Sequence, residues 1–257
     1  MRIVIKVGSS TLTHKAGRLN IRGVEQLVKV LSDIKNAGHE VILVSSGAIA
    51  MGVGKLNLPG KPSDMPGKQA AAAVGQCELM DTYDKMFAEY SHTVAQILLT
   101  GEDVEDEKRR ENIHNTISRL LELKVLPVIN ENDTVATAEI NVGDNDTLAA
   151  IVAGCAGADL LVLMSDIEGL YTADPRKDPS AVLIPRVEEI TPEIEALAGS
   201  AGTERGTGGM VTKIRAAKMV TAHGCDMVIL NGARPELLYE LAEGNDAGTR
   251  FIGRKNV

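Results

Sequence analysis

Two lysines carry the clearest chemical potential in this chain of 257 residues. Lys6 stands inside the apolar run Arg2 to Val7, and a lysine is almost never fully buried without a partner. One interpretation places its ammonium group at the end of a strand beside Gly8, whose missing side chain lets a phosphate approach the backbone. The alternative is that the ammonium group reaches solvent from the strand end, or pairs with a structural carboxylate.

The second lysine, Lys213, closes the glycine-rich segment GTERGTGGMVTK, residues 202–213. This segment matches neither the Walker A pattern nor the GxGxxG fingerprint. It leads into a helix-like sequence, so its backbone amides could hold a phosphate at a helix N-terminus, with Lys213 in the first turn. A surface loop without a ligand is the alternative.

A polar stretch, NENDTVATAEINVGDND, covers residues 130–146. A loop of this length inside a compact domain is uncommon unless it binds something. Asp144 and Asp146 near its end would repel each other, and any anionic substrate, unless a metal ion or an ammonium group lay between them. The stretch therefore predicts a binding loop, with a solvated surface loop as the alternative.

Together these segments supply lysines, backbone amides and carboxylates, but no evident general base. The five histidines show no metal-ligand spacing, and no GxSxG or Cys/His arrangement indicates a nucleophile. This combination favours phosphoryl transfer to an acceptor that is already an anion, since a carboxylate is ionised at neutral pH and needs no deprotonation. Catalysis then consists of positioning two anions and stabilising charge on the transferred group.

Composition argues against several other classes of protein. The net charge is -8, and aromatic residues make up 2% of the chain with no Trp, which argues against a nucleic-acid-binding surface. The most apolar run, residues 151–164, is too short to cross a bilayer. The chain starts directly in strand-like sequence without a signal peptide, and its three cysteines lack CxxC spacing. We therefore expect a cytoplasmic protein with reduced thiols and no membrane contacts.

Short apolar runs alternate with helical patterns along the chain. This alternation predicts one α/β domain, with a largely parallel sheet covered on both faces. Polar segments follow several of the strands, and in such sheets ligands bind beyond the carboxyl ends of the strands, so these segments should converge on one edge. The predicted strands cover residues 2–7, 40–44, 93–99, 125–130, 159–164 and 226–230, and the predicted helices cover residues 20–37, 64–90, 105–123, 147–158, 211–223 and 235–242.

Five motifs occur in this order: KVGSS at 6–10, SSGAIAMG at 45–52, NEND at 130–133, VGDND at 142–146 and GTGGMVTK at 206–213. Together they closely resemble the glutamate 5-kinases of the amino-acid kinase family, in that family's order and spacing. The resemblance implies a three-layer α/β/α sandwich, with residues 1–257 as a single kinase domain. It further implies an N-terminal lobe of about residues 1–155 that binds glutamate and a C-terminal lobe of about residues 156–257 that binds ATP. The PUA domain of many relatives is not expected.

The resemblance also implies roles for individual residues. Lys6 and Lys213 match the lysines that hold the phosphates and stabilise the transition state, and Asp146 matches the aspartate that orients them. Asp133 would pair with the substrate ammonium, and Asp144 would organise substrate or Mg²⁺; no residue is assigned as a direct metal ligand. The glutamate-binding residues would be Ser46, Asn130, Asp133, Asp144 and Asn145. The ATP-binding residues would be Lys6, Gly8, Ser165, Asp166, Thr207, Gly208, Gly209, Met210, Val211, Thr212 and Lys213.

The implied activity is phosphorylation of the side-chain carboxylate of L-glutamate by ATP with Mg²⁺, the first step of proline biosynthesis. The family further suggests feedback inhibition by proline, coupling to the reductase that consumes the labile glutamyl phosphate, and a homo-oligomer. The alternative among enzymes is a related kinase acting on N-acetylglutamate, aspartate, carbamate or UMP, although acidic Asp133 favours an acceptor with a free ammonium group. The alternative outside enzymes is a sensor of amino acids or nucleotides, against which the presence of both lysines argues.

Overall fold

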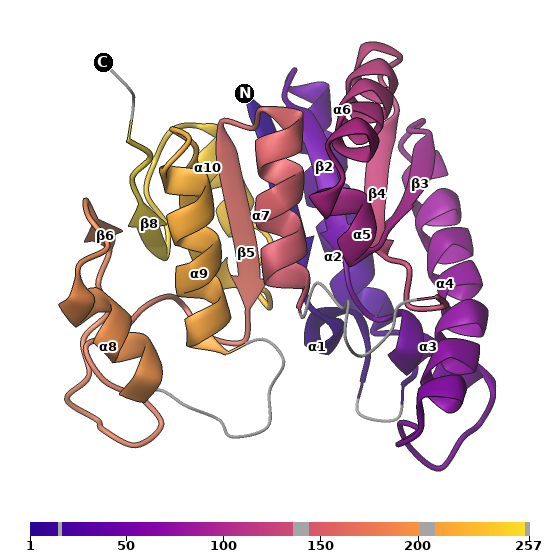
Figure 1. The fold of residues 1–257 in the computed structure, drawn as a ribbon, viewed down its shortest axis with the longest axis horizontal. Coiled ribbons are helices and arrows are strands. Elements are labelled where there is room, and N and C mark those ends of the chain that lie inside the picture. Colours follow the sequence, from indigo (N-terminus) through magenta and orange to yellow (C-terminus); the bar gives the residue numbers. More distant parts are fainter. Residues whose placement is uncertain (15–16, 136–143, 201–208, 255–257) are drawn as a thin grey trace.

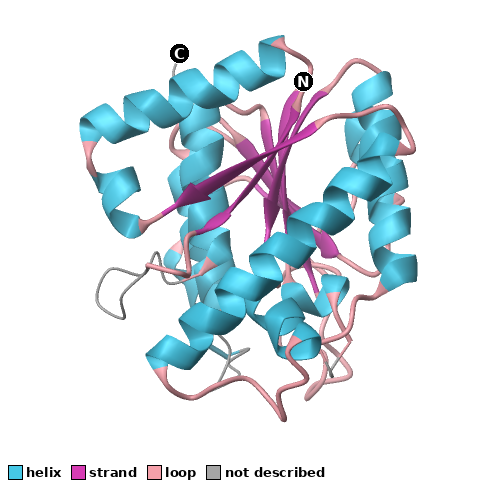
Figure 2. Cartoon of the chain, turned by 90° about the vertical axis from the view of Figure 1, so that its right-hand side faces the viewer, coloured by secondary structure: helices cyan, strands magenta, loops and turns pink. Residues whose placement is uncertain are grey.

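The computed structural model describes residues 1–14, 17–135, 144–200 and 209–254. The chain forms three layers, with one sheet between two layers of helices (Figure 1, Figure 2). The sheet order is β3-β4-β2-β1-β5-β7-β8-β6. Each neighbouring pair is parallel except β7 and β8. The predicted α/β/α sandwich with a largely parallel sheet is therefore confirmed.

The element bounds are as follows. The strands are β1 (Arg2–Val7), β2 (Glu40–Ser45), β3 (Val94–Leu99), β4 (Leu126–Glu131), β5 (Leu160–Ser165), β6 (Arg186–Val187), β7 (Asp226–Asn231) and β8 (Thr249–Phe251). The helices are α1 (Ser9–Leu12), α2 (Ile21–Asn36), α3 (Ala48–Lys55), α4 (Met65–Ala88), α5 (Gly101–Glu105), α6 (Glu107–Glu122), α7 (Asn145–Ala156), α8 (Pro192–Ser200), α9 (Met210–Thr221) and α10 (Leu237–Ala242).

The two faces of the sheet pack against different helices, and this decides where Lys6 points. On β1, Ile3 and Ile5 belong to the hydrophobic core that includes α2, α4 and α10. Val4 belongs to the opposite core, which includes α6, α7 and α9. Because successive side chains of a strand alternate between faces, Lys6 shares the face of Val4. Its side chain is therefore directed towards α7 and α9.

The polar stretch 130–146 is shorter as a loop than its sequence suggests. Asn130, which is also the last residue of the predicted strand 125–130, lies inside β4, where it is buried together with the residue after it. At the other end, α7 begins at Asn145 rather than at the predicted Thr147. It begins there because Asp144 Oδ1 accepts a hydrogen bond from the Thr147 backbone N–H at 2.8 Å, which caps the helix. Residues 136–143 lie outside the described residues.

Glycines allow α3 and α4 to pack closely beside the end of β2. A Cβ added at Gly75 of α4 would lie 1.8 Å from the carbonyl oxygen of Ala48, and one at Gly52 would lie 1.8 Å from that of Ala71. Gly47, the N-cap of α3, has φ 102°, a left-handed conformation that favours glycine. These contacts set the position of the turn that follows β2.

No helix in the described part of the chain is both long and apolar enough to cross a membrane.

Candidate active site

A cavity of about 410 Å³ opens at the carboxyl ends of the central strands. The strands that end there, β1, β2 and β5, all run parallel, so the segments that follow them meet at one edge of the sheet. The predicted convergence of polar segments is therefore confirmed. Of the residues predicted for the site, the cavity lining includes Lys6, Gly8, Ser46, Ser165, Asp166, Gly209, Met210 and Lys213.

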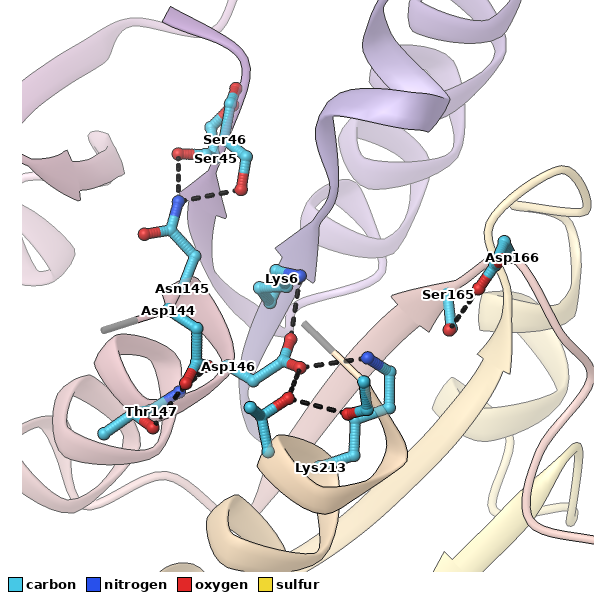
Figure 3. A network of polar contacts seen from close by, with 12 residues as sticks. Lys6, Ser45, Ser46, Asp144, Asn145, Asp146, Thr147, Ser165, Asp166 and Lys213 are labelled. Atoms are coloured by element: carbon cyan, nitrogen blue, oxygen red, sulfur yellow. Dashed lines mark hydrogen bonds and ion pairs between the residues drawn. The ribbon is translucent and has the colours of Figure 1, made fainter. Parts of the chain in front are cut away.

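Lys6 and Lys213 meet at one carboxylate, that of Asp146 (Figure 3). Lys6 Nζ lies 2.7 Å from Asp146 Oδ1, and Lys213 Nζ lies 2.9 Å from Asp146 Oδ2. The three side chains come from β1, α7 and α9, and their residues are 8%, 0% and 5% exposed for Lys6, Asp146 and Lys213 respectively. The two ammonium groups are therefore held side by side at the floor of the cavity.

The electrostatics of the trio formed by Lys6, Asp146 and Lys213 favour a bound anion. Burial alone would raise the pKa of Asp146, but the charges and hydrogen bonds of Lys6 and Lys213 outweigh burial and hold the pKa below its ordinary value. With the carboxylate ionised and both lysines protonated, the trio carries one net positive charge. In a partly buried site that charge attracts phosphate more strongly than it would in water.

The N-terminus of α9 adds backbone donors beside the trio. Gly209 is its N-cap, and within the described residues no side chain caps this helix. The first amides of an uncapped helix suit a phosphate. The Thr212 hydroxyl lies 2.9 Å from Asp146 Oδ2 and 2.7 Å from the Gly209 carbonyl oxygen, so its proton can be donated to either acceptor. Val211 is half exposed, and Thr207 and Gly208 lie outside the described residues.

Asn145 forms a second polar cluster on the β2 side of Lys6. Its Nδ2 lies 2.8 Å from Ser46 Oγ, 3.1 Å from Asn130 Oδ1 and 3.2 Å from the Ser45 carbonyl oxygen. The Ser45 hydroxyl in turn lies 2.9 Å from the hydroxyl of the fully buried Tyr83. The predicted residues Ser46, Asn130 and Asn145 are thus brought together and held in one orientation by their neighbours.

The two remaining acidic residues of the predicted acceptor site differ. Both carboxylate oxygens of Asp144 are used locally, because Oδ2 accepts from the Thr147 hydroxyl at 3.1 Å while Oδ1 caps α7. A role of Asp144 towards substrate or Mg²⁺ stays a prediction. Asp133 follows β4 and is half-buried; burial raises the pKa of its carboxyl, and the charge of Lys61 offsets this only in part. An ammonium group beside Asp133 would therefore be stabilising.

Ser165 and Asp166 lie on the other side of the trio, away from Ser46 and Asn145 (Figure 3). The Ser165 hydroxyl donates to Asp166 Oδ1 at 3.2 Å, and Arg176 donates to Asp166 Oδ2 at 2.6 Å. Burial would raise the pKa of Asp166, but the Arg176 hydrogen bond and the other contacts hold it below its ordinary value. The trio therefore stands between two polar walls.

Sequence reasoning missed Arg176 and Gln76. Arg176 also lines the cavity, and Gln76 Oε1 accepts from Asn130 Nδ2 at 2.9 Å. Arg176 stands in an exposed turn with no distinguishing sequence signal. Gln76 does have one, because it is a polar residue in the buried row of α4 that contains Ala72, Leu79 and Tyr83.

Comparisons with known proteins agree with this architecture. The sequence pattern described as the amino acid kinase family matches residues 1–231. A protein named glutamate 5-kinase from Clostridium perfringens is 52% identical over 99% of this chain and 96% of its own length. One from Clostridium tetani is 58% identical over 97% of this chain and 93% of its own length.

Solved structures show the same fold at low identity. Carbamate kinase from Giardia lamblia bound to AMP-PNP aligns with a TM-score of 0.69 and 17% identity, covering 98% of both chains. The product complex of isopentenyl phosphate kinase from T. acidophilum aligns with a TM-score of 0.64 and 19% identity, covering 98% of this chain and 100% of the other. With a family pattern spanning most of its length and relatives above half identity, the chain belongs to the amino acid kinase family.

Proposed function

We propose that this protein transfers the terminal phosphoryl group of ATP to the side-chain carboxylate of L-glutamate, which gives L-glutamyl 5-phosphate in the first step of proline biosynthesis. The observation that carries this proposal is the meeting of Lys6 and Lys213 at Asp146 between two polar walls. The choice of glutamate as acceptor rests on the relatives named glutamate 5-kinase, which match nearly the whole chain.

The reaction needs charge stabilisation more than proton transfer. A glutamate carboxylate oxygen forms a bond to the γ-phosphorus while the bond from that phosphorus to the bridging oxygen breaks, and ADP leaves. Two unit charges about 4 Å apart repel by roughly 4 kcal/mol at an effective dielectric of 20. Lys6 and Lys213 would offset this repulsion and stabilise the charge on the transferring group.

The two walls suggest how the substrates divide the site. One wall, which we call the acceptor wall, consists of Ser46, Asn130 and Asn145. It belongs to the N-terminal part of the chain, up to about residue 155, and would hold glutamate, with Asp133 at the ammonium group of the substrate. Residues from about 156 onwards would hold ATP, through Ser165, Asp166 and the start of α9. Lys6 is the exception, because it comes from the first part of the chain and would face both substrates.

Mg²⁺ would enter with the nucleotide. Both oxygens of Asp146 are occupied by lysines, and no group of three or more His, Cys, Asp and Glu side chains in the described residues is arranged to hold a metal ion. The donor set therefore fits a cation bound mainly by ATP phosphates and water, as Mg²⁺ prefers. Bound there, Mg²⁺ would neutralise part of the phosphate charge.

A panel of acceptors tests the proposed function. The protein, ATP and Mg²⁺ are incubated with L-glutamate, L-aspartate, N-acetyl-L-glutamate, carbamate or UMP, and hydroxylamine traps any acyl phosphate as a hydroxamate. We expect a hydroxamate with glutamate, and much slower ADP release with the other acceptors. Faster turnover of another acceptor would assign the protein to a different member of the family, and nucleotide binding without any turnover would favour a sensor.

Replacing Asp133 with Asn should raise the KM for glutamate. The substitution removes the charge that would pair with the substrate ammonium, and a hydrogen bond to a charged group is worth about 1.5–3 kcal/mol, or roughly 10- to 100-fold in KM. The KM for ATP should stay within about twofold, because the proposed partner of Asp133 is the ammonium group of glutamate. Asp84→Asn, on an exposed turn of α4, is the matched control. An unchanged glutamate KM in Asp133→Asn would remove Asp133 from the site.

We further propose that proline inhibits the enzyme by competing for part of the glutamate site. Proline, like glutamate, carries an ammonium group and a carboxylate on one carbon. Asp133 could therefore bind its ammonium group, and the amides of Asn130 and Asn145 could bind its carboxylate. Millimolar proline should raise the apparent KM for glutamate, and Asp133→Asn should weaken this effect. Initial rates that do not respond to proline at a glutamate concentration below KM would contradict the proposal.

Two further proposals concern the association of this chain with a second enzyme and with copies of itself. An acyl phosphate is labile in water, so we propose coupling to the reductase that consumes glutamyl phosphate, measurable as a higher flux in a mixture of both enzymes than with a semipermeable barrier between them. We also propose a homo-oligomer, which light scattering on a size-exclusion column would report as a multiple of the 27.3 kDa chain mass.

A further inference from the structure

Gln76 is a buried polar side chain that the proposed mechanism has not used. It lies on the core-facing row of α4 and is 8% exposed. Burying an amide is unfavourable unless its oxygen and its N–H groups find hydrogen-bond partners. The contacts of Gln76 therefore indicate what the site is built to hold.

Only one end of the Gln76 amide has a partner within the described residues. Oε1 accepts from Asn130 Nδ2 at 2.9 Å, which fixes the amide orientation. Nε2, which has two N–H donors, lies buried without a hydrogen-bond acceptor in this part of the chain. The second end of the amide thus offers donors to a group that is not part of the described protein.

Hydrogen bonds connect Gln76, and with it the Nε2 donor, to the acceptor wall. Asn130 Oδ1 lies 3.1 Å from Asn145 Nδ2, and Asn145 Nδ2 lies 2.8 Å from Ser46 Oγ at the cavity. Gly75, which packs against the Ala48 carbonyl of α3, allows α4 to come close enough for this contact. Gln76, Asn130, Asn145 and Ser46 therefore form one connected row.

The chemistry of glutamate indicates which of its groups the Gln76 Nε2 donor would bind. The reacting carboxylate of glutamate must face Lys6 and Lys213, whereas Asn145 and Ser46, at one end of the row, lie on the side of Lys6 away from Ser165 and Asp166 (Figure 3). Resting on the proposed function, we infer that Gln76 is a substrate-binding residue whose Nε2 donates a hydrogen bond to the α-carboxylate of the acceptor amino acid. A neutral amide suits this position because it binds a carboxylate without competing with the lysines for the phosphates.

The variant Gln76→Glu tests this inference most directly. It keeps an oxygen that can accept from Asn130 Nδ2 and replaces the free donor with a second carboxylate oxygen. The glutamate KM should rise about tenfold or more, because the new carboxylate repels the α-carboxylate of the substrate. L-Isoglutamine, which carries an α-carboxamide and keeps the side-chain carboxylate, should bind the variant relatively better. The preference for glutamate over isoglutamine in kcat/KM should fall about tenfold or more.

Two further variants complete the experiment. Gln76→Met, similar in length and without polar atoms, should also raise the glutamate KM while leaving the ATP KM within about twofold. Gln96→Glu introduces the same charge at an exposed position of β3 and should leave both KM values unchanged. Thermal unfolding of each variant shows whether it is folded.

The outcomes separate this inference from the proposed function. An unchanged preference in a folded Gln76→Glu overturns the assignment, because Gln76 Nε2 would then make no contact with the α-carboxylate of the substrate. Should Gln76→Glu not fold, an unchanged glutamate KM in Gln76→Met overturns it equally. A wild-type protein that forms no glutamyl hydroxamate overturns the proposed function, and the Gln76 assignment falls with it.

Discussion

Replacing either Lys6 or Lys213 with Met should lower kcat by about 10²-fold or more, the scale of removing one preorganised donor from a site where charge develops. Methionine keeps most of the side-chain length and removes the ammonium group. Both lysines contact one carboxylate at the cavity floor, so each loss should act on the transferring phosphoryl group. The KM values for glutamate and ATP should change much less than kcat, because the lost charge acts mainly in the transition state. Steady-state kinetics with hydroxamate detection measures the effects on kcat and on the two KM values separately.

Lys218→Met is the matched control for Lys213→Met. Lys218 lies on the same helix, α9, but its half-exposed side chain pairs with Glu195 away from the cavity. Its replacement should leave kcat within about twofold, because Lys218 does not line the cavity. The fold should also be kept, since an exposed ion pair contributes at most about 1 kcal/mol to the stability of a protein. Near-normal turnover in both Lys6→Met and Lys213→Met would leave the proposed mechanism without its main support.

Replacing Asp146 with Asn should damage both turnover and stability. The neutral amide leaves two buried ammonium groups close together without their shared counter-charge, and breaking a buried ion pair in this way costs about 3–5 kcal/mol. The lysines should then lose the carboxylate that orients them, so kcat should fall by about 10²-fold or more. Urea unfolding measures the first effect and hydroxamate formation the second.

The stability effect of Asp146 should depend on pH in a defined direction. The pKa of Asp146 is held below its ordinary value of 3.8 in the folded protein. Its contribution to the free energy of unfolding is therefore fully present above that ordinary value, and is lost as the pH falls through the lower, folded pKa. The difference in stability between wild type and Asp146→Asn should be large at neutral pH and should narrow in strong acid. A difference that stays constant across this range would show that Asp146 acts by packing rather than by charge; Asp84→Asn serves as the exposed control.

The trio of Lys6, Asp146 and Lys213 is costly for a folded protein. Taking charged groups out of water carries a penalty of several kcal/mol for each ion, which mutual attraction repays only when the geometry is good. Here each carboxylate oxygen has its own ammonium partner at hydrogen-bond distance. An apolar trio of similar volume could stabilise the fold equally well, so the charges fit the proposed role of the cavity in binding the phosphates of ATP.

Much of this protein was determined by the sequence alone. The apolar runs and helical patterns place β1, β2, β5 and β7 to within one residue at each end, because hydrophobic periodicity is a local property of the chain. The chemical inventory around Lys6, and the motifs shared with the family, also predict the type of reaction. Short elements such as α3, α8, β6 and β8 are missed, since they contain too few turns or residues for a period to be recognised.

The tertiary structure decided which side chains act together. Residues 6, 146 and 213 are far apart along the chain, and they meet because β1 directs Lys6 to the face where α7 and α9 begin. Asp144 and Asp146 look equivalent in the sequence, yet Asp144 caps α7 and Asp146, two residues further on, binds two lysines. Gln76 acquires a place beside Asn130 only through the packing of α4 on α3. Such contacts depend on how distant elements pack, and a pattern of neighbouring residues carries no record of that packing.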